Sequence, residues 1–162
     1  MSDTQPLPGN FGVEVLGADV VGMSDEVLRL LLLDLYSNRI TVVRAGDLTE
    51  VQYIDFARRI GDPLLLIPNK DKYPEIIPVD NLSEDIQETK HSAAHWHTDQ
   101  SFTSPLASVT MLYSLAAPCV GGETHFCDMA EAYATLSEST KSEIDELEVV
   151  HLRGVSIVAR EG

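Results

Sequence analysis

Two stretches in the first third of the chain carry apolar residues at the spacing of an amphipathic helix. The first presents one apolar face, made of Val27, Leu30, Leu31 and Leu35. Ser24 precedes this stretch and can cap a helix, because a serine hydroxyl accepts a hydrogen bond from the first turn. Asp25 and Glu26 then suit the positive end of the helix dipole. The pattern predicts a helix over about residues 25–36.

The second stretch opens with a capping-box pattern. Thr49 and Gln52 stand three residues apart, so each side chain can accept a hydrogen bond from the other residue's backbone. The periodic apolar residues that follow are interpreted as core: Val51, Ile54, Ala57 and Ile60. Gly61 can end this helix, since glycine adopts the backbone conformation that terminates helices.

Two shorter helices are predicted late in the chain. Asp128 and Glu131 repeat the capping pattern and start a helix that runs through Tyr133 to Leu136. Ser137 or Ser139 can cap a further helix that ends near Leu147. Both predictions start from the capping residues that precede each segment.

Other apolar runs predict strands. Residues 11–21 alternate apolar and small side chains, and residues 39–44 are rich in β-branched ones. Further strands are predicted over residues 109–115, 123–127 and 149–158. Residues 63–81 contain prolines that favour short edge strands and loops. Strands rich in turns, with helices packed outside them, fit an α+β fold of jelly-roll type.

Two polar segments interrupt this pattern. Residues 1–10 contain two prolines and are predicted to be a disordered N-terminus. Residues 82–94 are polar and acidic, and they are predicted to form a flexible loop, the usual place for a substrate lid. The remaining chain, residues 11–162, has the length of a single domain.

Composition excludes some partners. The 162 residues carry a net charge of -15, and no basic stripe is present to neutralise phosphates, so we expect no nucleic acid as partner. The apolar run 30–33 is far too short to cross a bilayer, so we expect no membrane partner. The first ten residues lack the basic and apolar regions of a secretory signal.

The most informative chemistry lies in the run H-W-H-T-D-Q-S-F at residues 95–102. On an extended backbone, residues two apart point to the same face, so His97 and Asp99 can converge on one ion. An imidazole and a carboxylate are two of the three ligands in the facial triad of non-haem Fe(II) oxygenases. Trp96 and Phe102 add apolar bulk on either side. The spacing alone leaves open that the two residues are an incidental surface pair.

A zinc site is an alternative for the same run. His95, His97 and Asp99 match the start of the H-x-H-x-D-H pattern of metallo-β-lactamase-type zinc hydrolases, in which the metal activates water. Gln100 stands where that pattern has its final histidine, so we rank a zinc-dependent hydrolase below an iron oxygenase.

The residues around this run favour iron. W-H-T-D-Q-S-F is followed by Pro105, by the apolar run 107–117, and by P-C-V-G-G-E-T-H-F-C-D-M at residues 118–129. In this order they resemble the TauD/TfdA family of Fe(II)- and 2-oxoglutarate-dependent dioxygenases. The G-G-E-T run is most similar to the branch that oxidises chlorophenoxyacetates. The resemblance extends upstream to residues 12–19 and 42–61 and covers nearly the whole chain.

The resemblance implies a double-stranded β-helix, the jelly roll of clavaminate synthase-like proteins, with flanking helices. It implies His97 and Asp99 as Fe(II) ligands, Thr124 as a contact for 2-oxoglutarate, and O2 as oxidant. The implied substrate is a small anionic organic compound of aryloxyalkanoate or sulfonate type. The family context is intracellular, so Cys119 and Cys127 are expected to be reduced thiols in the cytoplasm. Substrate-binding residues are not identified, and His151 is interpreted as structural.

One departure from the family limits these expectations. The family's distal histidine ligand and its arginine for 2-oxoglutarate lie in a C-terminal half, whereas this chain ends at Gly162. The resemblance therefore predicts the N-terminal portion of the domain, with a C-terminally incomplete jelly roll. A non-catalytic remnant is a third alternative. Exposed sheet edges would favour pairing with another chain, so a homo-oligomer is also an option.

Overall fold

The computed structural model of the chain describes residues 3–65, 72–79 and 96–151. The chain divides into two compact units, Met1–Val79 and Asp80–Gly162, and each is described by itself. No helix within the described ranges has the length and apolar character needed to cross a bilayer.

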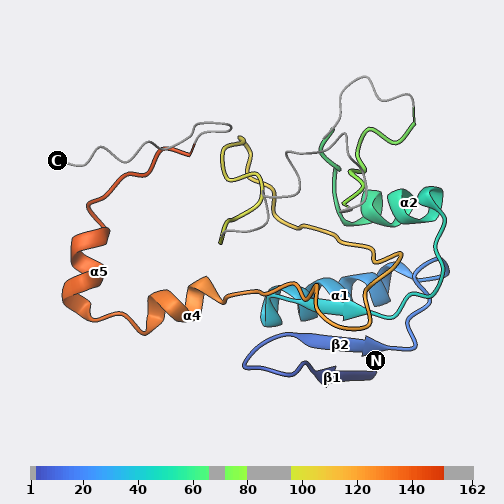
Figure 1. Cartoon of the computed structure of the whole chain (residues 1–162), viewed down its shortest axis with the longest axis horizontal. Coiled ribbons are helices and arrows are strands. Elements are labelled where there is room, and N and C mark those ends of the chain that lie inside the picture. Colours follow the sequence, from blue (N-terminus) through green and yellow to red (C-terminus); the bar gives the residue numbers. More distant parts are fainter. Residues whose placement is uncertain (1–2, 66–71, 80–95, 152–162) are drawn as a thin grey trace. The chain divides into compact units, whose positions relative to one another are not determined.

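The first unit contains a three-stranded sheet in the order β1-β2-β3 (Figure 1). Its strands are β1 (Asp3–Pro6), β2 (Val13–Leu16) and β3 (Thr41–Val43). β1 is antiparallel to β2, and β2 is parallel to β3. The N-terminal stretch predicted to be disordered thus contains a strand, because its backbone pairs with β2. The predicted strand over residues 11–21 is shortened to β2 by the turns that follow it.

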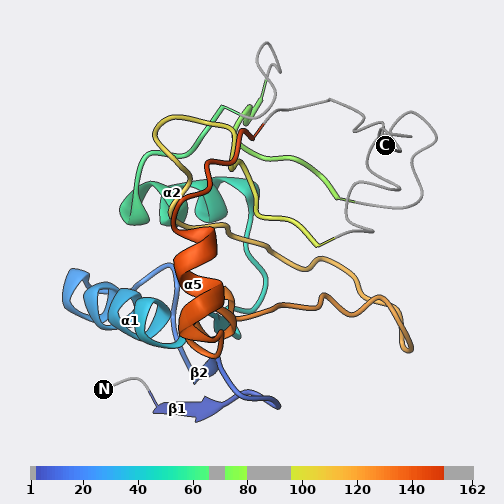
Figure 2. The same cartoon turned by 90° about the vertical axis from the view of Figure 1, so that its left-hand side faces the viewer.

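Two helices complete this unit, and both begin where their caps predict. α1 (Asp25–Asn38) starts after Ser24, whose hydroxyl accepts a hydrogen bond from the Val27 amide. α2 (Glu50–Ile60) starts after Thr49 with a complete capping box. α1 contacts both β2 and β3. It lies beside β2 in both views (Figure 1, Figure 2). The buried apolar residues of the described chain all belong to this unit: Val15, Val20, Met23, Leu28, Leu31, Ile54 and Phe56.

The second unit has two short helices and long irregular segments. α4 (Met129–Ala134) follows the predicted cap Asp128, and α5 (Glu138–Ile144) follows Ser137, one of the two predicted caps. Both helices end earlier than predicted. The strands predicted over 109–115 and 123–127 are absent, so those predictions are wrong. Apolar alternation sets only the direction of side chains, whereas a strand also needs a neighbour with backbone hydrogen bonds in register. No such ladder forms among the described residues of this unit. The strand predicted over 149–158 lies mostly outside the described residues.

Candidate metal centre

The His97 and Asp99 side chains lie together in the second unit. His97 Nε2 is 3.3 Å from Asp99 Oδ1, and each side chain is about half exposed. Asp99 begins a turn over residues 99–102, in which Gln100 has a positive φ of 53°. The two side chains thus approach each other across two positions, although residues 96–98 form no strand.

The two oxygens of Asp99 have different neighbours. Oδ1 faces the imidazole of His97, whereas Oδ2 accepts a hydrogen bond of 3.1 Å from the hydroxyl of Thr110. The hydrogen bond from Thr110 therefore holds Oδ2, while Oδ1 lies beside the imidazole nitrogen of His97. This arrangement suits a carboxylate that binds an ion through a single oxygen.

The spacing of the two donor atoms fits a metal ion. Nitrogen and oxygen ligands lie about 2.1 Å from a divalent transition metal, so two adjacent octahedral ligands are about 3.0 Å apart. The observed separation of 3.3 Å is close to that value. Among the residues that the structure describes, no third histidine, cysteine or carboxylate joins the pair. The pair can thus supply two adjacent ligands, and its donor types suit Fe(II).

A pocket of about 280 Å³ lies beside Asp99. Its lining consists of Thr98, Asp99, Ser101, Leu106, Ala107 and His151. His151 Nδ1 is hydrogen-bonded to the Ser101 hydroxyl at 2.8 Å. The sequence suggested only a structural role for His151, and no local pattern connects residues fifty positions apart. The structure nevertheless places this histidine in the wall of the candidate site.

Thr124 is exposed and does not line that pocket. It follows the Gly121–Gly122 turn, in which both glycines have positive φ values of 80° and 78°. These values favour glycine, because a Cβ atom is strained there. The chain therefore bends at these two glycines, while the role of Thr124 stays a prediction.

Several residues weighed from the sequence lie outside the described part of the chain. They are His95 of the zinc alternative, the loop 82–94, and two of the three lysines (Lys70, Lys72 and Lys90) that could meet a substrate carboxylate or sulfonate, namely Lys70 and Lys90. Lys72 is described and lies 3.6 Å from Glu50 and 4.7 Å from the centre of the Tyr73 ring. It therefore belongs to a surface cluster of the first unit.

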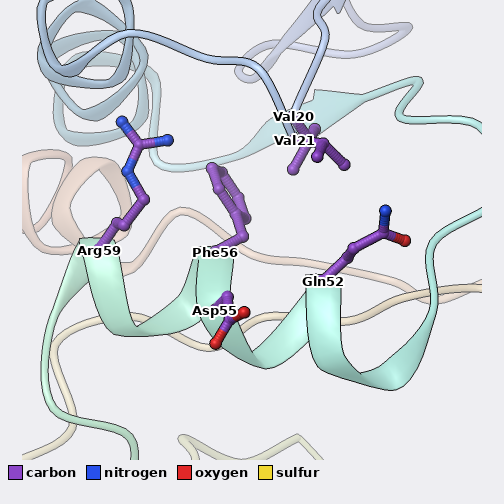
Figure 3. Close-up of a pocket in the computed structure, with 6 residues that line it drawn as sticks. All are labelled: Val20, Val21, Gln52, Asp55, Phe56 and Arg59. Atoms are coloured by element: carbon purple, nitrogen blue, oxygen red, sulfur yellow. The ribbon is translucent and has the colours of Figure 1, made fainter.

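A second pocket, of about 150 Å³, lies between α2 and the turn before α1 (Figure 3). Phe56 points from α2 towards Val20 and Val21, whereas Asp55 points away from them. Arg59 at its edge donates a 2.8 Å hydrogen bond to Asp25. Arg59 therefore links α2 to the start of α1, and we assign no chemistry to this pocket.

Comparison with known proteins adds a family match. The profile described as "Taurine catabolism dioxygenase TauD, TfdA family" matches residues 3–160. The 2,4-dichlorophenoxyacetate dioxygenase of Cupriavidus pinatubonensis is 32% identical over 127 residues, which cover 69% of this chain and 44% of that protein.

Two further relatives match most of this chain. The (S)-phenoxypropionate dioxygenase of Sphingobium herbicidovorans is 28% identical over 92% of this chain and 53% of that protein. The sulfate ester dioxygenase of Pseudomonas putida is 26% identical over 92% of this chain and 49% of that protein. The names of all three include both alpha-ketoglutarate and dioxygenase, and none of the three is named as a zinc hydrolase. This chain spans about half the length of these relatives.

Proposed function

Because this chain belongs to the TauD, TfdA family of dioxygenases, we propose that it acts as a non-haem Fe(II)- and 2-oxoglutarate-dependent dioxygenase. The substrate would be a small organic anion. The relatives named above act on phenoxyalkanoates and sulfate esters, which combine an apolar body with a carboxylate or sulfate group. The observation that carries the proposal is the 3.3 Å approach of His97 Nε2 to Asp99 Oδ1.

His97 and Asp99 would hold the Fe(II) ion. When bound, the ion would supply the oxidising chemistry, in which O2 and 2-oxoglutarate are consumed and succinate, CO2 and a hydroxylated product are released. The residues of this chain would fix two coordination positions and limit access of water on one side. Leu106 and Ala107, in the pocket beside Asp99, would offer apolar surface to the organic substrate.

Thr124 would bind the distal carboxylate of 2-oxoglutarate. Its support is chemical and local: an exposed hydroxyl follows a Gly-Gly turn, where the backbone lets an anion approach closely. A Thr124→Val variant should weaken the binding of 2-oxoglutarate without changing that of Fe(II), as measured by titration of each component separately.

The fold and compartment follow the same proposal. The α+β elements described above would form part of a jelly-roll domain, as the family implies. Cys119 and Cys127 are both free and exposed, which suits a reducing compartment such as the cytoplasm.

Large apolar side chains are exposed in the second unit, including Trp96, Leu115 and Val120. A second copy of the chain is one partner that would cover such residues.

Anaerobic spectroscopy tests the function. Fe(II) and 2-oxoglutarate added to the full chain should give the visible charge-transfer band of the chelate. His97→Ala and Asp99→Ala should each abolish that band, whereas His125→Ala, which changes an exposed histidine of the same unit, should leave it intact. A band that persists in both ligand variants would contradict the proposed site. Tightly held zinc with ester hydrolysis would instead support the hydrolase alternative.

A further inference from the structure

We infer that Thr110 is a positioning residue that orients Asp99 for metal binding. The inference rests on the proposed function in one respect only, namely that Asp99 is a ligand. It adds a residue that neither the motif around His97 nor the Gly-Gly turn includes.

The geometry assigns the two carboxylate oxygens of Asp99 separate tasks. The Thr110 hydroxyl donates to Oδ2 at 3.1 Å, and Oδ1 lies 3.3 Å from His97 Nε2. A hydroxyl that donates to an ionised carboxylate forms a stronger bond than one between neutral groups. Since the Asp99 side chain is half exposed, packing alone does not fix its rotation. The hydrogen bond from Thr110 keeps one oxygen directed towards the position of the ion.

The surroundings of Thr110 point to its hydroxyl rather than its methyl group. Side chains over residues 107–114 alternate between half-buried and exposed positions, and Thr110 occupies an exposed one between Val109 and Met111. A threonine at an exposed position contributes little to packing, so removal of its hydroxyl leaves the local fold in place. Valine has nearly the same shape and is also β-branched, but it lacks the hydroxyl.

The chemical consequence is a preorganised ligand. Groups that hydrogen-bond to metal ligands orient them and tune their basicity, and their loss typically lowers metal affinity about 10- to 100-fold. Without the Thr110 hydroxyl the Asp99 carboxylate can rotate. Only a fraction of its orientations would then suit metal binding, which lowers the affinity for the ion. We therefore expect Thr110 to affect the affinity and ligand field of the ion more than the stability of the fold.

Co(II) binding to the full chain provides the test. Trp96 is the single tryptophan of the sequence and adjoins His97, so quenching of its fluorescence reports binding at this site. Thr110→Val should weaken Co(II) binding by about 10-fold or more and change the visible spectrum of bound Co(II). Thr110→Ser restores the donor and should bind within about 3-fold of the unmodified chain. Ser108→Ala removes an exposed hydroxyl two residues away and should have no effect.

The outcomes separate a failure of this inference from a failure of the proposed function. Thr110→Val that binds Co(II) like the unmodified chain, with the same spectrum, overturns this inference and leaves the proposed function standing. Asp99→Ala that binds like the unmodified chain overturns both. If Thr110→Val lowers the thermal midpoint, the same Co(II) titration is made with Thr110→Ala, and the same criterion applies to it. Weak binding in Thr110→Ser as well would show that the hydroxyl is not the responsible group, and this too overturns the inference.

Discussion

At the scale of single residues, the best-defined electrostatic interaction of the first unit surrounds Glu14 on β2. Its carboxylate accepts a hydrogen bond of 2.6 Å from Arg44 Nε and one of 3.0 Å from Gln5 Nε2. Gln5 is the ladder partner of Glu14 on β1, and Arg44 directly follows β3. These hydrogen bonds, that of Arg44 first, lower the pKa of Glu14 below its ordinary value of 4.5. One side chain thus connects all three strands.

This lowered pKa makes the stability of the first unit depend on pH. A carboxylate with a lower pKa in the folded state stabilises the fold above pH 4.5, and the contribution is lost as the pH falls through the folded value. Glu14→Gln should therefore reduce the fall in thermal midpoint between neutral and acidic pH, measured by circular dichroism. Arg44→Gln should reduce it more than Gln5→Ala, because the Arg44 bond contributes most. Identical pH profiles for Glu14→Gln and the unmodified chain would contradict this.

The residues of the candidate site differ in how far sequence could predict them. His97 and Asp99 stand two positions apart, so their approach follows from short-range geometry, although residues 96–98 form no strand. Thr110 contacts Asp99 from 11 positions along the chain, and His151 contacts Ser101 from 50 positions along it. Contacts of that separation depend on the tertiary fold, which no local pattern specifies.

At the scale of secondary structure, caps were the most reliable signals because they act within four residues. Ser24, Thr49, Asp128 and Ser137 each cap the helix that they were expected to cap. The apolar face of α2 was predicted less well. Ile54 is buried as expected, but Val51 is 49% exposed and Phe56 is buried in addition. Periodicity identifies an apolar side, whereas the elements that cover it decide which residues of that side are buried.

The capping box of α2 allows a stability prediction. The backbone N–H of Gln52 donates to the Thr49 hydroxyl at 3.3 Å, and the backbone N–H of Thr49 donates to the side-chain oxygen of Gln52 at 2.9 Å. Thr49→Ala removes the first of these acceptors and should lower the free energy of unfolding by about 1 kcal/mol. Thr49→Ser keeps the hydroxyl and should cost much less. Urea unfolding followed by circular dichroism measures both, and equal midpoints for Thr49→Ala and Thr49→Ser would show that the cap contributes nothing.

At the scale of the whole molecule, packing is unequal between the two units. Every residue classed as buried lies in Met1–Val79, and the described residues of Asp80–Gly162 are exposed or half-buried. Because apolar burial is the main favourable term in folding, most of the stability should reside in the first unit. The candidate site therefore lies on the less buried unit. This fits the tendency of binding regions to come from the less stable part of a structure.

Hydrogen exchange followed by mass spectrometry tests this division. Amides of α1 and α2 should exchange slowest, since they are hydrogen-bonded within helices that cover buried residues. Peptides from residues 96–127 should exchange faster. Addition of Co(II) should slow exchange around His97, Asp99 and Thr110, because a bound ion stabilises the conformation that holds it. The same addition should leave α1 unchanged. Slower exchange over 96–127 than over α1 without metal would show that the stable core of this chain lies elsewhere.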